Sequence, residues 1–239
     1  NVGLQLRKST STAKGRRTHA PKQPLVALVE NHVADVVCVM EAGQRDSEDL
    51  RSLRQLVDEA SGGNVTVGGS QPSTEALTQP GISRNQAQCT LARKELELAN
   101  ATSQCNGRLH VSIMKLASGD TLRIGQIYGV SGATACENGH NGGDGVEQAT
   151  LNRCRARQKR ELRDAVNADK SKAAAAGQLA LYLVDQNAVA RPEDRAGGVL
   201  LPQDTDVDAV VHCFNDDPEY TDVHRDAGGS NKTFYRRRI

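Results

Sequence analysis

Short apolar runs that end abruptly in polar residues are the main pattern along this chain. The clearest run covers residues 179–184 and is followed by Asp185, Gln186 and Asn187. A run of this length is typical of a strand buried on both faces, and it is too short for most helices. The pattern therefore predicts a buried strand with an exposed polar end.

Two more apolar runs end in the same way. Residues 36–40 lead directly into Glu41, and residues 122–127 lead into Tyr128. The second run follows an alternating segment, residues 109–114, so these two segments predict a β-hairpin. Because ligands gather at strand ends in sheets that are covered by helices, the polar residues after each run are candidates for a site.

Helical periodicity separates the predicted strands. Apolar residues on one face predict a helix that begins near Ser47 and ends at Gly62. A longer helix is predicted over residues 147–168, with its charges on a solvated face, and a third over residues 205–214. Alternating strands and helices in a chain of 239 residues predict one α/β domain covering residues 1–239.

The residue types at the strand ends suit acid–base or metal chemistry. Asp185 and Asn187 stand two positions apart, so on a strand both side chains point to one side. The carboxylate can accept a proton or bind a metal, and the amide can donate hydrogen bonds to an oxyanion. Simpler interpretations remain open: an Asp-x-Asn turn here, a helix cap at Glu41 and a half-buried strand aromatic at Tyr128.

The order of these segments resembles the endonuclease/exonuclease/phosphatase superfamily, which has a DNase I-like fold. The resemblance rests on short motifs in the family's order, namely Asn1 to Leu4, Met40-Glu41, Tyr128-Gly129, residues 184–187, residues 222–225 and Thr233-Phe234. Residues 184–187 read Val-Asp-Gln-Asn where the family has Gly-Asp-Phe-Asn. The segment from Tyr220 to Tyr235 is most similar to the endonuclease domains of LINE-type retrotransposons.

The resemblance implies a two-sheet, four-layer α/β sandwich that hydrolyses phosphodiesters with Mg²⁺ or Mn²⁺. It implies that Glu41 binds the metal with Asn1 beside it. Asp185 then orients or deprotonates the attacking water, and Asn187 hydrogen-bonds the phosphoryl oxygens. Tyr128 contacts the phosphate or stabilises the leaving group.

Further residues are expected at the edge of the substrate site. By the resemblance, Asp222 and Arg225 match the family's Asp-x-x-Arg motif and organise that edge. Arg7 belongs to a basic segment, residues 5–20, which is either a phosphate-contacting loop or a solvated one. The histidines His212 and His224 are interpreted as ordinary surface or helix residues.

The family's final motifs, Ser-Arg-Ile-Asp and Ser-Asp-His, do not occur in the 239 residues. We therefore expect a domain that is incomplete at its C-terminus and lacks its last strands, as one monomeric domain of a larger polypeptide. The expected substrate is DNA, nicked in the manner of a retroelement endonuclease. The alternatives are a phosphatase of the inositol phosphate or sphingomyelin type, and a non-catalytic descendant that acts as a structural or binding module.

Composition narrows these expectations only slightly. The formal net charge is +1, so any basic surface for nucleic acid must be local. None of the cysteines forms a C-x-x-C motif, which argues against a zinc site, although Cys89 and Cys105 could bridge a loop in a secreted protein. No apolar stretch approaches the length of a membrane span. We expect an intracellular protein, nuclear if it derives from a retroelement.

Overall fold

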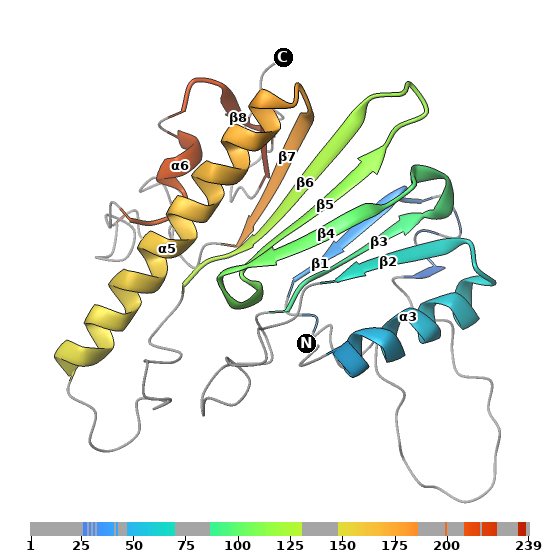
Figure 1. The fold of residues 1–239 in the computed structure, drawn as a ribbon, viewed down its shortest axis with the longest axis horizontal. Helices are drawn as coiled ribbons and strands as arrows, with labels where there is room; N and C mark the ends of the chain where they lie inside the picture. The colour runs from blue at the N-terminus through green and yellow to red at the C-terminus, as the bar shows by residue number, and fades with distance from the viewer. Residues whose placement is uncertain are drawn as a thin grey trace, which may run out of the picture.

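The structure, a computed structural model, contains two β-sheets packed face to face, with a helix on each outer face (Figure 1). The residues that it describes are 26, 27, 29, 31, 33–40, 42, 47–69, 87–130, 148–185, 199, 208–215, 217–223 and 234–237. The layers run helix, sheet, sheet, helix. The two-sheet, four-layer α/β sandwich expected from the sequence is confirmed.

The smaller sheet has three antiparallel strands in the order β1-β3-β2, namely β1 (Val36–Val39), β3 (Cys89–Arg93) and β2 (Val65–Gly69). Its outer face is covered by helix α3 (Ser47–Ser61), as predicted. Leu50, Leu53 and Val57 of α3 are buried against this sheet, and the helix ends where Gly62 adopts a φ of +60°. The helical periodicity of the sequence therefore identified the correct buried face.

The larger sheet has six strands in the order β4-β5-β6-β7-β9-β8. The strands are β4 (Ala99–Gln104), β5 (Leu109–Lys115), β6 (Thr121–Tyr128), β7 (Leu179–Asp185), β8 (Tyr220–Asp222) and β9 (Phe234–Arg237). Strands β5 and β6 form the predicted hairpin. Strands β6 and β7 are parallel, and helix α5 (Gln148–Ala175) lies between them in the sequence, as a parallel crossover requires.

Helix α5 covers the outer face of the six-stranded sheet (Figure 1). Leu162, Val166 and Ala173 are fully buried there, against strand residues such as Tyr182. The helix continues past the predicted end at residue 168, to Ala175. Within the predicted range, Arg157, Arg160, Glu161 and Asp164 are exposed, as expected of a solvated face. Beyond it, Asp169 and Lys170 are buried and paired with the rest of the domain.

Two further predictions of secondary structure need correction. Strand β4 was not predicted, because its sequence, Ala-Asn-Ala-Thr-Ser-Gln, is polar and lies at the edge of the sheet, where no apolar alternation is required. Within the described part of the predicted helix at 205–214, the only helix is the short α6 (His212–Asn215). The apolar spacing there arises from a turn that buries Val210, Val211 and Phe214.

Candidate site at the carboxyl ends of β6 and β7

Tyr128 and Asp185 are neighbours at the ends of two parallel strands. They are register partners in the β6–β7 pairing, and the backbone N–H of Gly129 donates a hydrogen bond of 2.5 Å to the carbonyl oxygen of Asp185. In Figure 1 the carboxyl ends of both strands lie at the lower edge of the six-stranded sheet. Parallel pairing therefore brings together two of the three residues predicted to be catalytic.

Both side chains project from the face of the sheet that is turned toward the three-stranded sheet. Side chains alternate along a strand, and Ile124 of β6 and Leu183 of β7 pack between the sheets. Tyr128 and Asp185 stand an even number of residues further along and therefore share that face. Asp185 is exposed and Tyr128 is partly exposed, so an accessible carboxylate lies beside an accessible phenol.

The carboxyl end of β1 lies at the same edge. Val39 pairs with Cys89, and the N–H of Ala42 donates to the carbonyl of Ala87 at 2.8 Å. The next residue, Gln88, donates from its side-chain amide to the carbonyl of Arg108 at 2.8 Å. The same Arg108 oxygen accepts the N–H of Tyr128 at 2.8 Å, which links the end of the smaller sheet directly to the Tyr128 strand end.

An apolar cavity of about 520 Å³ opens between the two sheets beside this edge. Met40, after β1, and Val184, near the end of β7, both line it. Each residue immediately precedes a predicted metal or catalytic carboxylate, Glu41 in one case and Asp185 in the other. Met40 and Val184 therefore line one cavity, and Glu41 lies outside the described residues.

A buried polar network lies directly behind the strand ends. The side-chain amide of Gln126 donates to the hydroxyl of Thr90 at 2.6 Å, and the Thr90 hydroxyl lies 2.9 Å from that of Ser112. The Ser112 hydroxyl lies 3.2 Å from Nε2 of His110. Burial lowers the pKa of His110 to about 4, so its imidazole is neutral near pH 7. These contacts cross between the sheets and fix the relative position of their ends.

Sequence analysis did not identify this polar network, nor Arg108. One signal was present in the sequence, because alternate positions of a strand point to the same face. The polar residues inside the apolar strands all fall on the face between the sheets, namely Thr90, His110, Ser112 and Gln126. A polar residue at a core position indicates a partner across the core, because an unpaired polar group is costly to bury. That partner could not be identified before the pairing of the sheets was known.

Asp222, a predicted substrate-site residue, lies further from these strand ends. It is the last residue of β8 and is paired with Tyr235 of β9, which is paired in turn with Tyr182 of β7. Asp222 is therefore two strands away from β7 and level with Tyr182 rather than with Asp185. The sheet register does not bring Asp222 together with Tyr128 and Asp185.

The other predicted site residues lie outside the described part of the chain. They are Asn1, Arg7, Glu41, Asn187 and Arg225. Among the residues that the structure describes, no group of three or more His, Cys, Asp or Glu side chains could hold a metal ion. The described part of the candidate site is therefore the pair Tyr128 and Asp185 with its supporting contacts.

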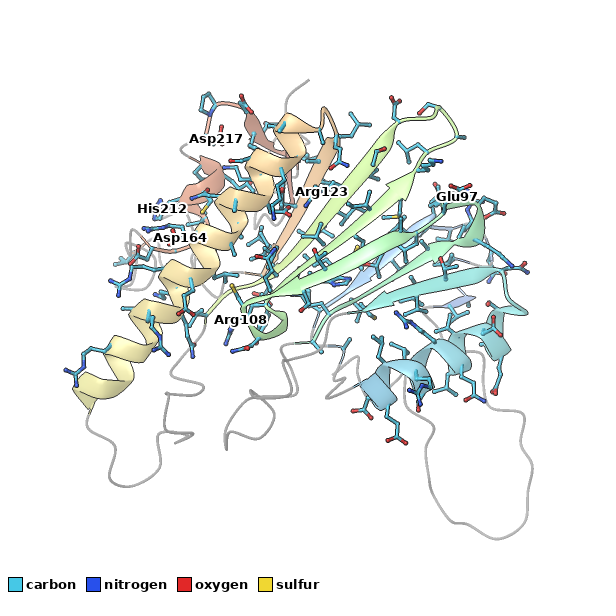
Figure 2. The ribbon with its side chains drawn as sticks, in the orientation of Figure 1. Glu97, Arg108, Arg123, Asp164, His212 and Asp217 are labelled. Carbon is cyan, nitrogen blue, oxygen red and sulfur yellow. The ribbon has the colours of Figure 1, made fainter. Side chains whose placement is uncertain are left out.

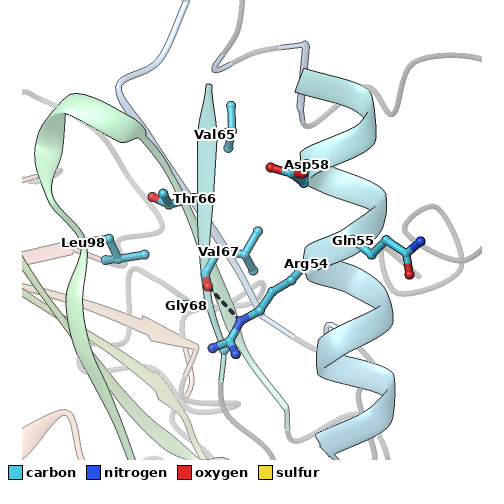
Figure 3. A pocket seen from close by; sticks show the side chains of 9 residues that line it. Arg54, Gln55, Asp58, Val65, Thr66, Val67, Gly68 and Leu98 are labelled. Carbon is cyan, nitrogen blue, oxygen red and sulfur yellow. Dashed lines mark hydrogen bonds between the residues drawn. The ribbon is translucent and has the colours of Figure 1, made fainter. Parts of the chain in front are cut away.

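A second, open hollow of about 830 Å³ lies between α3 and the outer edge of β2 (Figure 3). There the guanidinium of Arg54 donates to the carbonyl of Val67 at 3.2 Å, as the dashed line in Figure 3 marks. A side chain that occupies an edge carbonyl protects the strand from pairing with another chain. Arg54 therefore helps to protect this edge of the three-stranded sheet.

Cys38, Cys89, Cys105 and Cys213 form no disulfide. Cys89 and Cys105 do not form the bridge considered for a secreted protein. Burial raises the pKa of Cys38 to about 12 and that of Cys105 to about 11, so neither thiol ionises near pH 7. No helix in the described residues has the length and apolar character needed to cross a membrane.

Of the comparisons with known proteins, the one with solved structures finds similar chains. No protein-family model matches the chain, and no curated protein matches it. Among solved structures, the catalytic domain of APE2 from Xenopus laevis aligns with a TM-score of 0.47 and 13% sequence identity, over 90% of this chain and 77% of that one. A TM-score this low does not establish a common fold, so the fold class rests on the sheets and helices described above.

Proposed function

We propose that residues 1–239 form a divalent-metal-dependent phosphodiesterase domain, most specifically an endonuclease that nicks DNA. The observation that supports the proposal is the convergence of Met40 and Val184 on one cavity, because each precedes a carboxylate that the superfamily motifs would place in the site. The pairing of Tyr128 with Asp185 at the same edge adds a phenol to the expected set. DNA as substrate is inferred from the similarity of residues 220–235 to retroelement endonucleases.

The residues at this edge suit a hard divalent cation. Asp185 is an exposed carboxylate at a strand end, and Mg²⁺ typically uses only one or two carboxylates while it keeps several waters. Glu41 and Asp185 would hold the ion, with Asn1 beside them. When bound, such an ion polarises a phosphoryl oxygen and makes water a better nucleophile.

The side chains of the chain itself then have separable tasks. Asp185 accepts a hydrogen bond from the attacking water and orients it or takes its proton. The Tyr128 hydroxyl donates a hydrogen bond to the phosphate or to the leaving oxygen, where negative charge develops. Asn187 donates its amide hydrogens to the phosphoryl oxygens, and Arg225 and Arg7 bind flanking phosphates.

The direct test is nicking of supercoiled plasmid in Mg²⁺ or Mn²⁺, with EDTA as the blank. Asp185→Asn and Glu41→Gln should each lower the nicking rate at least about 10²-fold. Asp120→Asn is the matched control, since Asp120 is an exposed carboxylate in the turn at the other end of the β5–β6 hairpin. Mn²⁺ binding, followed by water-proton relaxation, should weaken in the first two variants and stay unchanged in the control.

The outcomes separate the competing functions. Nicking that survives both Asp185→Asn and Glu41→Gln would overturn the assignment of the site. Release of phosphate from a soluble inositol phosphate without nicking would favour the phosphatase alternative. Absence of both activities together with absence of Mn²⁺ binding would favour a non-catalytic structural or binding module.

A further inference from the structure

We propose that Arg108 is a positioning residue for this site, which acts by holding Tyr128 and the turn after it in place. The inference rests on the proposed function, and it assigns a role to a side chain outside the expected catalytic and metal-binding set. Arg108 directly precedes β5, and Tyr128 is the last residue of β6. In Figure 2 Arg108 lies at the lower end of the six-stranded sheet, where β6 and β7 also end.

Arg108 contacts Tyr128 through both its backbone and its side chain. Its carbonyl oxygen accepts the N–H of Tyr128 at 2.8 Å. Its guanidinium donates to the carbonyl of Gly129 at 2.8 Å and to that of Tyr128 at 3.3 Å. Its Cζ atom also lies 5.5 Å from the centroid of the Tyr128 ring, within the range of a cation–π contact.

These contacts fix the strand end that faces Asp185. Gly129, whose carbonyl accepts from Arg108, donates its own N–H to the carbonyl of Asp185. Arg108 is therefore one hydrogen-bonded residue away from Asp185 and in direct contact with Tyr128. A guanidinium can serve two carbonyls at once because its donors form a rigid fork, whereas the single ammonium group of lysine lacks that geometry.

The position of Arg108 carries an energetic cost, because its charged guanidinium is withdrawn from water. Arg108 is only 4% exposed, and burial lowers the pKa of its guanidinium to about 10. The chain reaches it through Cys105, Asn106 and Gly107, three consecutive residues with positive φ. A positive φ is unfavourable for Cys105, and the two hydrogen bonds from the Gln88 amide to the carbonyls of Gly107 and Arg108 help to hold this turn.

A double-mutant cycle tests whether Arg108 acts through Tyr128. In the plasmid-nicking assay, Arg108→Lys should lower kcat about 10-fold with little change in KM, because a misplaced group weakens transition-state contacts more than binding. In the Tyr128→Phe background, Arg108→Lys should lower kcat less than about 3-fold, since the hydroxyl that Arg108 positions is already absent. Arg108→Met should cost more than Arg108→Lys in the Tyr128 background.

Arg123→Lys is the matched control. Arg123 is a buried arginine of the same sheet, on the same strand as Tyr128 but near its other end (Figure 2). The Arg123→Lys variant should reduce the stability of the fold and leave kcat within about 2-fold of wild type. Equal losses of kcat from Arg123→Lys and Arg108→Lys would overturn the proposal, as would full additivity of Arg108→Lys and Tyr128→Phe.

A second readout does not depend on activity. With ring-labelled tyrosine, the NMR signals of Tyr128 are those that disappear in Tyr128→Phe. Arg108→Lys should shift or broaden these signals, and Arg123→Lys should leave them in place. If the wild-type chain does not nick DNA, the proposed function fails, and unchanged Tyr128 signals in Arg108→Lys would then separately overturn the claim that Arg108 holds the ring.

Discussion

Arg123 on β6 and Asp169 on α5 form a buried ion pair that attaches the long helix to the six-stranded sheet. Nε of Arg123 donates to Asp169 at 3.0 Å, and a second guanidinium nitrogen donates to the other carboxylate oxygen. The hydroxyl of Tyr182 donates to the same carboxylate at 2.8 Å. Asp169 therefore accepts hydrogen bonds from two strands, β6 and β7, at the point where they run parallel.

Removal of the Asp169 carboxylate should lower the unfolding free energy far more than removal of the Tyr182 hydroxyl. Asp169→Ala leaves the Arg123 guanidinium buried without its counter-ion and should lower the unfolding free energy by about 3–5 kcal/mol. Tyr182→Phe removes one hydrogen bond and should cost about 1–2 kcal/mol. Urea denaturation with an unchanged slope measures both. A loss below about 1 kcal/mol for Asp169→Ala would show that the pair contributes no net stability.

A methyl group added at Gly125 should also be costly. A Cβ there would lie 2.4 Å from a ring carbon of Tyr182, a side chain that is fully buried. Gly125→Ala should lower the unfolding free energy by about 1–3 kcal/mol or more.

Gly69→Ala provides the comparison for this change. Its Cβ would meet the end of the Leu50 side chain at a similar distance, but a terminal methyl group can move aside. The loss should therefore be smaller than at Gly125. An equal loss in both variants would mean that the rigidity of the Tyr182 ring is not the cause.

His110 should make the fold sensitive to acid. Its pKa is lowered to about 4 by burial, whereas an unfolded histidine titrates near 6.5. Between these pH values the unfolded chain binds a proton that the folded chain excludes, so stability falls as the pH decreases from about 6.5 to 4. The contribution at pH 4.5 is about 2–3 kcal/mol.

Replacement of the imidazole tests this linkage. His110→Asn should reduce the loss of stability between pH 7 and pH 4.5 by about 2–3 kcal/mol relative to wild type, as measured by urea denaturation at each pH. Ser112→Ala keeps the imidazole and should retain the wild-type pH dependence. An identical pH dependence in His110→Asn and wild type would show that His110 is not the responsible group.

Lys170 should hold the segment that contains α6 and β8. Its ammonium lies 2.7 Å from the Asp217 carboxylate, donates to the carbonyl of Cys213, and lies 4.7 Å from the ring of Tyr220. Lys170→Met should speed hydrogen exchange in residues 211–222 and leave β5 and β6 protected. Lys172→Met, at an exposed position on the same helix, should change neither. Unchanged exchange in Lys170→Met would contradict this role.

The strands were predictable where burial alone determined the residue types. Residues 179–184 are continuously apolar because β7 is central and lies between two other strands, and this burial is visible in the sequence alone. β4 was missed because an edge strand can be polar on both faces. The end of α5 was misplaced because Asp169 and Lys170 are polar residues at buried positions, and their partners are far away in the sequence.

The candidate site was predictable only in part, for a related reason. Polar residues at strand ends identified Tyr128 and Asp185, and the parallel pairing of β6 with β7 makes them neighbours. Asp222 was expected at the edge of the site from motif order, which carries no information about strand order. The register through β9 separates Asp222 from Asp185. Arg108 was invisible because its role depends on a turn and on contacts between the sheets.

The order of strands in the larger sheet has a consequence for how the protein is made. β8 precedes β9 in the sequence, yet β9 lies between β7 and β8 and is the strand through which β8 joins the sheet. On the ribosome, β8 therefore emerges before the strand that will pair with it. Until β9 follows, the ring of Tyr220 can pack against Tyr182 and Phe214, which are already synthesised. The aromatic cluster can hold the newly made segment against the domain before the backbone of β8 pairs with β9.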